Sequence, residues 1–401
     1  MKIIPRNKYL NQIRPYYNKQ LIKSITGQRR VGKSYFLKQV SDELRKLHPK
    51  ANYIYIDKEQ HNFDGLQTYS HLFDYIKQNS AKKSMNYIFL DEVQEIKGFE
   101  KALRSLLAEG NYDIYCTGSN SDMFSGELAT FLSGRQIEIN VYSLSFREFV
   151  EFNKSQPNKD TLSLYIKYGG LPYLMHLPND DEIVFDYLNN IYATILYRDV
   201  VRRNQIRDVS FLENLIRYLA DNTGSIVSAS RIAGFMKSQK NSKAVSVIIN
   251  YLNYLVQAYI VKGVVRQDIQ GKRIFETGEK YYFQDLGLRN AIAGYKPNDI
   301  AKIIENAVYN HLLYLGYKVH VGKLGEKEVD FISEKKGDYC YFQVAYLLSD
   351  EKIIEREFGN LISIRDHFPK YVISMDEFPI TAAYSGIRHY SLIDFLLLEE
   401  L

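Results

Sequence analysis

The sequence predicts an α/β protein whose N-terminal core is a parallel sheet covered by helices on both faces. Three observations lead to this fold class: a glycine-rich loop between a strand and a helix, an apolar strand that ends in two acids, and a regular alternation of strands and helices around them. A near-continuous apolar run indicates a strand buried on both faces. Alternation of this kind gives a three-layer arrangement with a parallel sheet in the middle.

The glycine-rich loop is GQRRVGKS at residues 27–34, which satisfies G-x-x-x-x-G-K-[ST], between a short apolar strand at 21–25 and a helix at 33–46. In such a loop, backbone N–H groups and a helix N-terminus face phosphate oxygens. Lys33 is expected to reach the β- and γ-phosphates, and the Ser34 hydroxyl to complete a Mg²⁺ shell. The predicted ligand-binding residues are Gly27, Arg29, Arg30, Val31, Gly32, Lys33, Ser34 and Tyr35. The alternative, a glycine-rich turn with a stray Lys-Ser, leaves the flanking strand and helix unexplained.

The two acids end the apolar strand YIFLDE at residues 87–92. Ligands of α/β sheets bind beyond the carboxyl ends of the strands, so both carboxylates are placed for chemistry. Asp91 is predicted to hold the Mg²⁺ hydration shell, and Glu92 to orient and polarise the attacking water of a phosphoryl transfer. Taken alone, this strand end could also carry two solvated acids; together with the upstream loop it predicts a nucleotide site.

Further strands are expected at 52–56, 112–117 and 136–142, with a helix between the first two strands and another after the acidic strand. The strand at 112–117 ends in Gly118-Ser119-Asn120. We expect Asn120 to sense the γ-phosphate from this position. Thr117 or Ser119 could serve instead, and Ser119 could equally cap a following helix.

The order of phosphate loop, acidic strand and TGSN strand end resembles the AAA+ ATPases. The segments LSGR (132–135), SLSFREF (143–149), GGLP (169–172) and YRDVV (197–201) resemble a prokaryotic group of these ATPases, with a helical lid, a winged helix and a nuclease-like C-terminal domain. The resemblance covers essentially the whole chain. It implies ATP and Mg²⁺ as ligands, and hydrolysis to ADP and phosphate used as a conformational switch on DNA or a protein partner. The rival functions are a nucleotide-gated DNA or protein binder with little hydrolysis, and an ATP-dependent nuclease.

This resemblance and the length of 401 residues, which suggests two to four domains, give the expected organisation. An ATPase core with an N-terminal lead-in helix is expected at 1–155, and a helical lid at 156–207. A winged helix-turn-helix is expected at 208–285. A domain like the PD-(D/E)xK nucleases, or restriction endonucleases, is expected at 286–401. AAA+ relatives often act as rings, but this sequence shows no clear arginine finger acting between subunits, which leaves a monomer open.

Composition points to a cytoplasmic protein without a membrane span. Hydrophobic residues make up 45% and charged residues 25%, as in ordinary soluble domains, and no apolar run is long enough for a signal peptide or a bilayer span. The two cysteines, Cys116 and Cys340, lie inside expected strands and should be buried free thiols. The net charge of +5 is too small for its length to indicate nucleic acid by itself.

Two sets of arginines are candidates for contact with the γ-phosphate. Arg135 follows Ser133 and Gly134 and is our candidate catalytic arginine. The other set lies on one expected helix and consists of Arg198, Arg202, Arg203 and Arg207, partly offset by Asp199 and Asp208. Such a run is usually a solvated face, but an arginine near a lid can also stabilise transition-state charge.

The expected winged helix consists of three helices and a hairpin around Gly271. A winged helix of this kind can contact double-stranded DNA. Alternatively, it can be a purely structural part of the lid. The third helix offers only Lys243 as a basic residue. The basic residues of the expected wing are Arg266, Lys272, Arg273 and Lys280. DNA contact would therefore be mainly with phosphates.

The C-terminal segment departs from the nuclease pattern that it resembles. Glu305 and Asp330 match two metal-binding acids of that pattern, but Gln343 stands in place of the third acid and Ala345 in place of the lysine. Glutamine is a weaker Mg²⁺ ligand, and alanine cannot assist a hydroxide. Lys327 and Lys335 are near enough in sequence to be considered as replacements. We expect a degenerate domain that folds or contacts DNA or a protein partner, without cleavage of its own.

Overall fold

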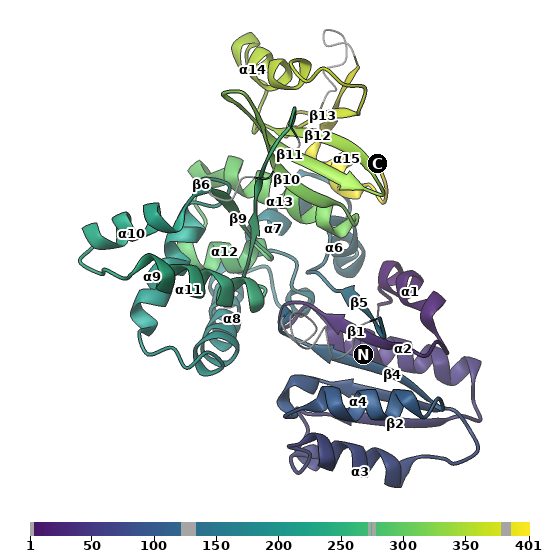
Figure 1. The fold of residues 1–401 in the computed structure, drawn as a ribbon. Coiled ribbons are helices and arrows are strands. Elements are labelled where there is room, and N and C mark those ends of the chain that lie inside the picture. The colour runs from purple at the N-terminus through teal and green to yellow at the C-terminus, as the bar shows by residue number, and fades with distance from the viewer. Residues whose placement is uncertain (1–3, 122–133, 272–273, 275–277, 378–385) are drawn as a thin grey trace. The chain divides into compact units, whose positions relative to one another are not determined.

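The computed structural model describes residues 4–121, 134–271, 274, 278–377 and 386–401 (Figure 1). By contacts within the chain it divides into two compact units. The first comprises residues 1–142 with the short segment 257–259, and the second comprises residues 143–256 and 260–401. The two units are described separately below. Among the described residues, no helix combines the length and the apolar character needed to cross a bilayer.

The first unit contains a five-stranded parallel sheet in the order β2-β3-β4-β1-β5. Its strands are β1 (Ile22–Thr26), β2 (Asn52–Asp57), β3 (Asn86–Asp91), β4 (Tyr112–Gly118) and β5 (Gln136–Asn140). Every residue of β1, β3 and β4 is buried, as a near-continuous apolar run predicts for central strands. The predicted parallel α/β core is confirmed.

Helices cover both faces of this sheet. On one face, α3 (Tyr69–Asn79) and α4 (Phe99–Ala108) pack Leu72 and Leu103 against strand residues that include Ile88. On the other face, Tyr53 of β2 donates its hydroxyl to Leu44 O of α2 (Lys33–Leu47) at 2.7 Å. The lead-in helix α1 (Asn7–Ile13) packs there too, with Tyr9 against Phe36 of α2.

The second unit begins with helices. They are α6 (Phe146–Asn153), α7 (Lys159–Tyr168), α8 (Asp181–Thr194), a π-helix η6 (Ile195–Arg202), α9 (Val209–Asp221), α10 (Ala229–Ser238) and α11 (Val245–Gln257). We expected residues up to 155 to belong with the ATPase core. Instead, α6 lies in the second unit, because Phe146 and Phe149 of α6 pack on Tyr165 of α7.

Two sheets follow in the second unit. A three-stranded antiparallel sheet has the order β6-β9-β7, with β6 (Ile226–Val227), β7 (Val261–Val264) and β9 (Glu279–Phe283). A six-stranded sheet has the order β14-β13-β12-β11-β10-β8. Its strands are β8 (Arg266–Asp268), β10 (Lys318–Leu324), β11 (Lys327–Lys335), β12 (Asp338–Val344), β13 (Lys370–Ser374) and β14 (Ile387–Ser391).

We expected strands at 259–265 and 273–275 with Arg266 on the wing between them, and the structure has strand β8 at Arg266–Asp268. It bridges Ile274 through Gln267, so a hairpin is present. However, β8 also pairs along its length with β10, with Arg266 opposite Val321, and so becomes the edge of the six-stranded sheet. The hairpin and the C-terminal sheet are therefore continuous, which sequence spacing did not indicate.

Helices also cover both faces of the six-stranded sheet. On one face, α14 (Glu351–Ile362) packs Phe358 and Leu361 against Val329 and Val372. On the other face lie α13 (Ile300–Tyr314) and α15 (Leu392–Leu397), where Phe395 contacts Phe342. Cys116 of the first unit and Cys340 of the second are buried and free, as predicted.

A glycine junction explains the GGLP segment. Asp285 precedes α12 (Leu286–Ala293), is buried, and accepts hydrogen bonds from the N–H groups of Gly170 and Leu288. A Cβ at Gly169 would lie 2.3 Å from Asp285 Oδ1, and one at Gly287 would lie 1.9 Å from Tyr168 O. Only glycine allows the end of α7 and the start of α12 to approach so closely.

Candidate nucleotide site in the first unit

The phosphate loop connects β1 to α2, and its two glycines are required by its backbone. Gly27 has φ +140°, and a Cβ there would lie 2.1 Å from Val141 O. Gly32 has φ +94° and is the N-cap of α2. No side chain of the described residues caps α2 at Gly32, and an uncapped helix N-terminus favours an anion.

Lys33 is buried and lies over the loop. Its Nζ donates to Gly27 O at 3.0 Å and to Gln28 O at 2.9 Å. The Gln28 side-chain amide is also buried, and neither of its polar atoms has a hydrogen-bond partner among the described residues. A buried polar group without a partner is costly, so this loop presents both a cation and an unsatisfied amide.

Asp91 ends β3 and is held by two hydroxyls. Thr117 Oγ1, at the end of β4, donates to Asp91 Oδ1, and the Ser34 hydroxyl is a second hydrogen-bond partner. Burial raises the pKa of Asp91 to about 6, although these two hydrogen bonds lower it in part. The loop and the acidic strand thus converge, because Ser34 begins α2 and Asp91 ends a strand of the same sheet.

Glu92 is held by polar contacts on several sides. Its carboxylate accepts hydrogen bonds from Gln94 Nε2 and, at 3.3 Å, from Ser119 Oγ. Arg29 Nη2 of the phosphate loop lies 3.9 Å from Glu92 Oε2. Glu92 has φ +54°, a left-handed conformation that is uncommon for glutamate and is often found at functional sites. Sequence reasoning missed Gln94, whose signal was its position two residues after Glu92 in the same short turn.

The other predicted residues of this site lie as follows. Asn120 is buried and lies two residues after the end of β4. Arg30 and Tyr35 are exposed on the loop and on the first turn of α2. Arg135 is exposed, and its carbonyl accepts from Ile22 N. Residues 132–133 lie outside the described residues. So do residues 122–131, where a helix capped by Ser119 would continue.

Comparison with known proteins places the chain in a family. Residues 19–150 match the family described as an AAA domain, and residues 159–299 match a domain of unknown function (DUF8612). An uncharacterized protein of Haemophilus influenzae is 34% identical over 403 residues, which cover 98% of this chain and 99% of that protein. The chain belongs to the same family. An uncharacterized protein of Methanocaldococcus jannaschii is 30% identical over 329 residues, covering 78% of this chain and 71% of that protein.

Among solved structures, the Aeropyrum pernix ORC1 protein in complex with DNA is similar over 73% of this chain and 93% of that chain. The identity is 11% and the TM-score 0.33. The AAA domain named by the family match includes the whole of the phosphate loop and the acidic strand. The predicted α/β, P-loop class of the first unit is thus confirmed by the family and by its parallel sheet.

Outside the AAA domain, the predicted acids Glu305 of α13 and Asp330 of β11 do come together, but with a partner that we placed elsewhere. Lys280 of β9, expected on an exposed wing, is buried with 3% of its side chain exposed. Its Nζ lies 2.9 Å from Glu305 Oε1, 2.8 Å from Glu328 Oε1 and 3.7 Å from Asp330 Oδ1. Lys280 is therefore not a surface residue, because three carboxylates hold it inside.

The lysines considered as replacements do not reach this cluster. Lys327 Nζ donates to Ser363 Oγ, and Lys335 Nζ donates to Leu315 O. Gln343 Oε1 accepts from Asp330 N at 3.4 Å, and Ala345 is buried in the core under α14. Glu328 is a third acid that the sequence analysis did not single out, although it lies two residues before Asp330 on the same strand.

The arginines at 198–207 and the basic residues of the expected winged helix lie in different environments. Arg198 and Arg202 lie on the π-helix η6 of the second unit, where Asp199 is buried. Arg203 is half-buried, and Arg207 is exposed. Lys243, just before α11, pairs with Asp208 at 2.5 Å. Lys272 and Arg273 lie outside the described residues.

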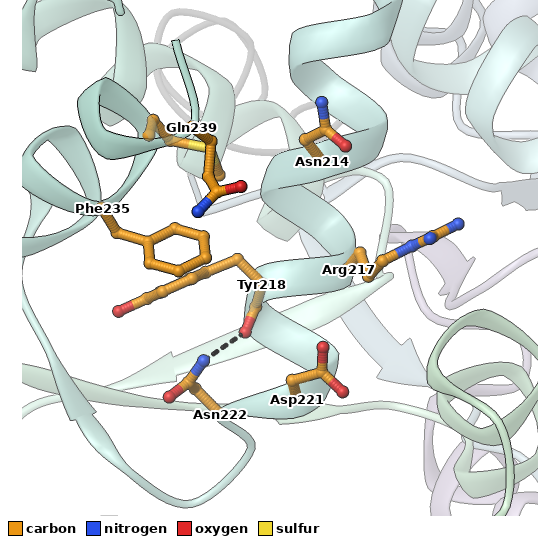
Figure 2. Close-up of a pocket in the computed structure, with 8 residues that line it drawn as sticks. Asn214, Arg217, Tyr218, Asp221, Asn222, Phe235 and Gln239 are labelled. Atoms are coloured by element: carbon orange, nitrogen blue, oxygen red, sulfur yellow. Dashed lines mark hydrogen bonds between the residues drawn. The ribbon is translucent and has the colours of Figure 1, made fainter. Parts of the chain in front are cut away.

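A hollow of about 460 Å³, lined by both polar and apolar side chains, lies between α9 and α10 (Figure 2). Its lining residues are Asn214, Arg217, Tyr218, Asp221, Asn222, Phe235, Met236 and Gln239. The rings of Tyr218 and Phe235 are 4.7 Å apart between centroids, and Asn222 Nδ2 donates to Tyr218 O at 2.8 Å. This hollow is distinct from the phosphate loop, which belongs to the other unit.

Proposed function

We propose that the AAA domain binds Mg-ATP at residues 27–34 and hydrolyses it to ADP and phosphate. The observation that carries this proposal is the convergence of Ser34 on Asp91, with Lys33 over the loop and Glu92 at the same strand end. An ammonium, a hydroxyl and two carboxylates are the groups that P-loop phosphoryl transfer uses.

The residues fit a magnesium nucleotide in their chemistry. Lys33 donates to two neutral carbonyls, which phosphate oxygens can replace as acceptors. Ser34 and Asp91 provide a hydroxyl and a carboxylate of the kind that Mg²⁺ prefers. The bound nucleotide supplies the γ-phosphate as electrophile, and its metal supplies positive charge at the phosphate oxygens.

The chain's own residues would then act in three ways. Lys33 and the N–H groups of the loop orient the phosphates and balance their charge. Glu92, held in place by Gln94 and Ser119, orients a water and takes its proton as the water attacks phosphorus. Asn120, Thr117 or Ser119 at the end of β4 reports on the γ-phosphate, and Arg135 is the proposed arginine contact.

The test of hydrolysis is Glu92→Gln, because it removes the proton acceptor and keeps the shape. We expect unchanged ATP binding and phosphate release that falls by roughly 10²-fold or more. Glu95→Gln is the matched control, since Glu95 is exposed in the same short turn and should keep the parent rate. If the Glu92→Gln variant hydrolysed ATP at the parent rate, Glu92 would not be the residue that activates the water. Tight binding without phosphate release by the parent would indicate a nucleotide-gated binder.

For the second unit we propose that it meets the partner whose contact the ATP state controls. The order α9, α10, α11 followed by β7 and β9 supports a winged helix at 208–285, and the six-stranded sheet with α13 supports a nuclease-like domain at 286–401. Because Lys280 is buried and Lys243 is paired, we propose that the expected wing would contact DNA through Arg266, Lys272 and Arg273. Such DNA contact would be with phosphates and would weaken with salt.

A further inference from the structure

The acidic cluster of the second unit is built from elements that are far apart in sequence. Glu305 comes from α13, Glu328 and Asp330 come from β11, and Lys280 comes from β9 of the three-stranded sheet. The Lys280 ammonium is within 2.9 Å of two of these carboxylates and 3.7 Å from the third. It is thus the shared cation of all three acids.

The remaining positions around the carboxylates are also filled. Tyr282 OH, on the same strand as Lys280, donates to Glu305 Oε1 at 2.5 Å. Val344 N donates to Asp330 Oδ2 at 2.8 Å. A Cβ at Gly224 would lie 3.1 Å from Glu305 Oε2, so the turn after α9 lies directly on this carboxylate. These contacts place a hydroxyl, a backbone N–H and the turn at Gly224 against the carboxylates of Glu305 and Asp330.

The charges of the cluster favour a resident ammonium. Burial alone would lower the pKa of Lys280, but the charges of Glu305, Asp330 and Glu328 outweigh burial and raise it, so the side chain stays protonated. A protonated lysine cannot take a proton from water. A divalent ion at the same place would repel it at close range, and would also have to displace it from its carboxylates.

We propose that the Lys280 ammonium takes the place of a metal cation between Glu305, Glu328 and Asp330, so that the cluster is a metal-free anchor between the two sheets of the second unit and not a hydrolytic centre. Lys280 and Tyr282 are two residues apart on β9 and so point to the same face of the strand. Both side chains of that face contact Glu305. The cluster therefore joins the three-stranded sheet to the six-stranded sheet and its helix α13, whether or not nucleotide is bound at the AAA domain.

The test uses the full chain without nucleotide, in EDTA and with Mn²⁺. Lys280→Met keeps the length of the side chain and removes its charge; its melting temperature in EDTA should fall on the order of 10 °C, because the buried Asp330 and the largely buried Glu305 lose the counterion that they share with Glu328. Mn²⁺ should restore most of this loss and bind at one site more than in the parent, measured by calorimetry. Lys262→Met is the matched control, since Lys262 is exposed on the neighbouring strand β7, and should melt like the parent.

Two further variants test the proposal if Lys280→Met does not fold. Asp330→Asn in the parent background should leave Mn²⁺ binding unchanged, because the parent cluster holds no metal. Lys280→Met combined with Glu305→Gln should melt above Lys280→Met alone in EDTA, since it leaves one buried charge fewer. Mn²⁺ binding by the parent that Asp330→Asn removes would overturn the proposal. So would a Lys280→Met variant as stable as Lys262→Met, or plasmid cleavage that Asp330→Asn abolishes.

Discussion

Lys33 of the first unit and Lys280 of the second are both buried, but their hydrogen-bond acceptors differ in charge. Lys33 of the AAA domain donates to two neutral carbonyls at 3.0 and 2.9 Å. Lys280 of the second unit is surrounded by three carboxylates. A carbonyl acceptor can be exchanged for a phosphate oxygen without separating opposite charges, whereas removing a lysine from Glu305, Glu328 and Asp330 leaves their charge without its counterion. Both residues are lysines, but the carbonyl partners of Lys33 are groups that phosphate oxygens can replace, whereas the acids around Lys280 need its charge.

The largest expected effect comes from removing Lys33. Lys33→Ala should lower phosphate release by roughly 10²–10³-fold, because it removes a preorganised charge at the phosphates. Its melting temperature without nucleotide should stay close to that of the parent, since the hydrogen bonds that it loses to Gly27 O and Gln28 O are to neutral carbonyls. This is the reverse of the expectation for Lys280→Met, which costs stability.

The control for Lys33→Ala is Lys38→Ala, an exposed lysine of the same helix α2. It should leave both phosphate release and melting unchanged. If Lys33→Ala melted far below Lys38→Ala, Lys33 would also be committed to the fold, and the contrast between the two lysines would be lost.

The AAA domain was predictable because its constraints are local. Gly27, Gly32, Lys33 and Ser34 are fixed by one loop, and buried strands on both sides of it read as apolar runs. The contacts of Asp91 with Thr117 could be anticipated, since parallel strands bring their carboxyl ends to one edge. The bond from Arg29 to Glu92 could not, because it depends on the side-chain path across that edge.

The second unit was less predictable because its decisive contacts span distant segments. Lys280 approaches Glu305 and Asp330 from another sheet, and no periodicity signals that pairing. A basic residue near an expected hairpin was therefore interpreted as surface. Likewise, the GGLP segment is explained only by Asp285 and Gly287, more than a hundred residues away.

A smaller effect should show whether the turn at Gly224 packs against the Glu305 carboxylate. Gly224→Ala combines φ +73° with a Cβ at 3.1 Å from Glu305 Oε2, so it should destabilise by roughly 2–4 kcal/mol. Gly316→Ala has a similar φ of +88° with nothing within 4 Å, and should cost about 1–2 kcal/mol for the backbone alone. Urea unfolding of both variants measures the difference. Equal losses would mean that the turn at Gly224 does not close over the carboxylate.

The smallest effect concerns which hydroxyl at the end of β4 supports hydrolysis. Ser119 Oγ donates to Glu92 Oε2 at 3.3 Å and accepts from Gln94 Nε2 at 3.2 Å. Ser119→Ala removes neutral hydrogen bonds worth about 0.5–1.5 kcal/mol, so kcat should fall by roughly two- to tenfold. KM for Mg-ATP should stay unchanged, because Glu92 acts on water and not on the nucleotide.

Thr117→Val provides the contrast on the neighbouring acid. Thr117 Oγ1 donates to Asp91 and accepts from Glu92 N at 2.9 Å, so its loss should raise KM for Mg-ATP and also reduce stability by leaving a buried N–H unpaired. Asn120→Ala, measured alongside, should lower kcat without either of those changes if Asn120 is the sensor. Steady-state phosphate release across ATP concentrations separates the three. If Ser119→Ala raised KM and Thr117→Val lowered only kcat, the division of labour between Asp91 and Glu92 would be reversed.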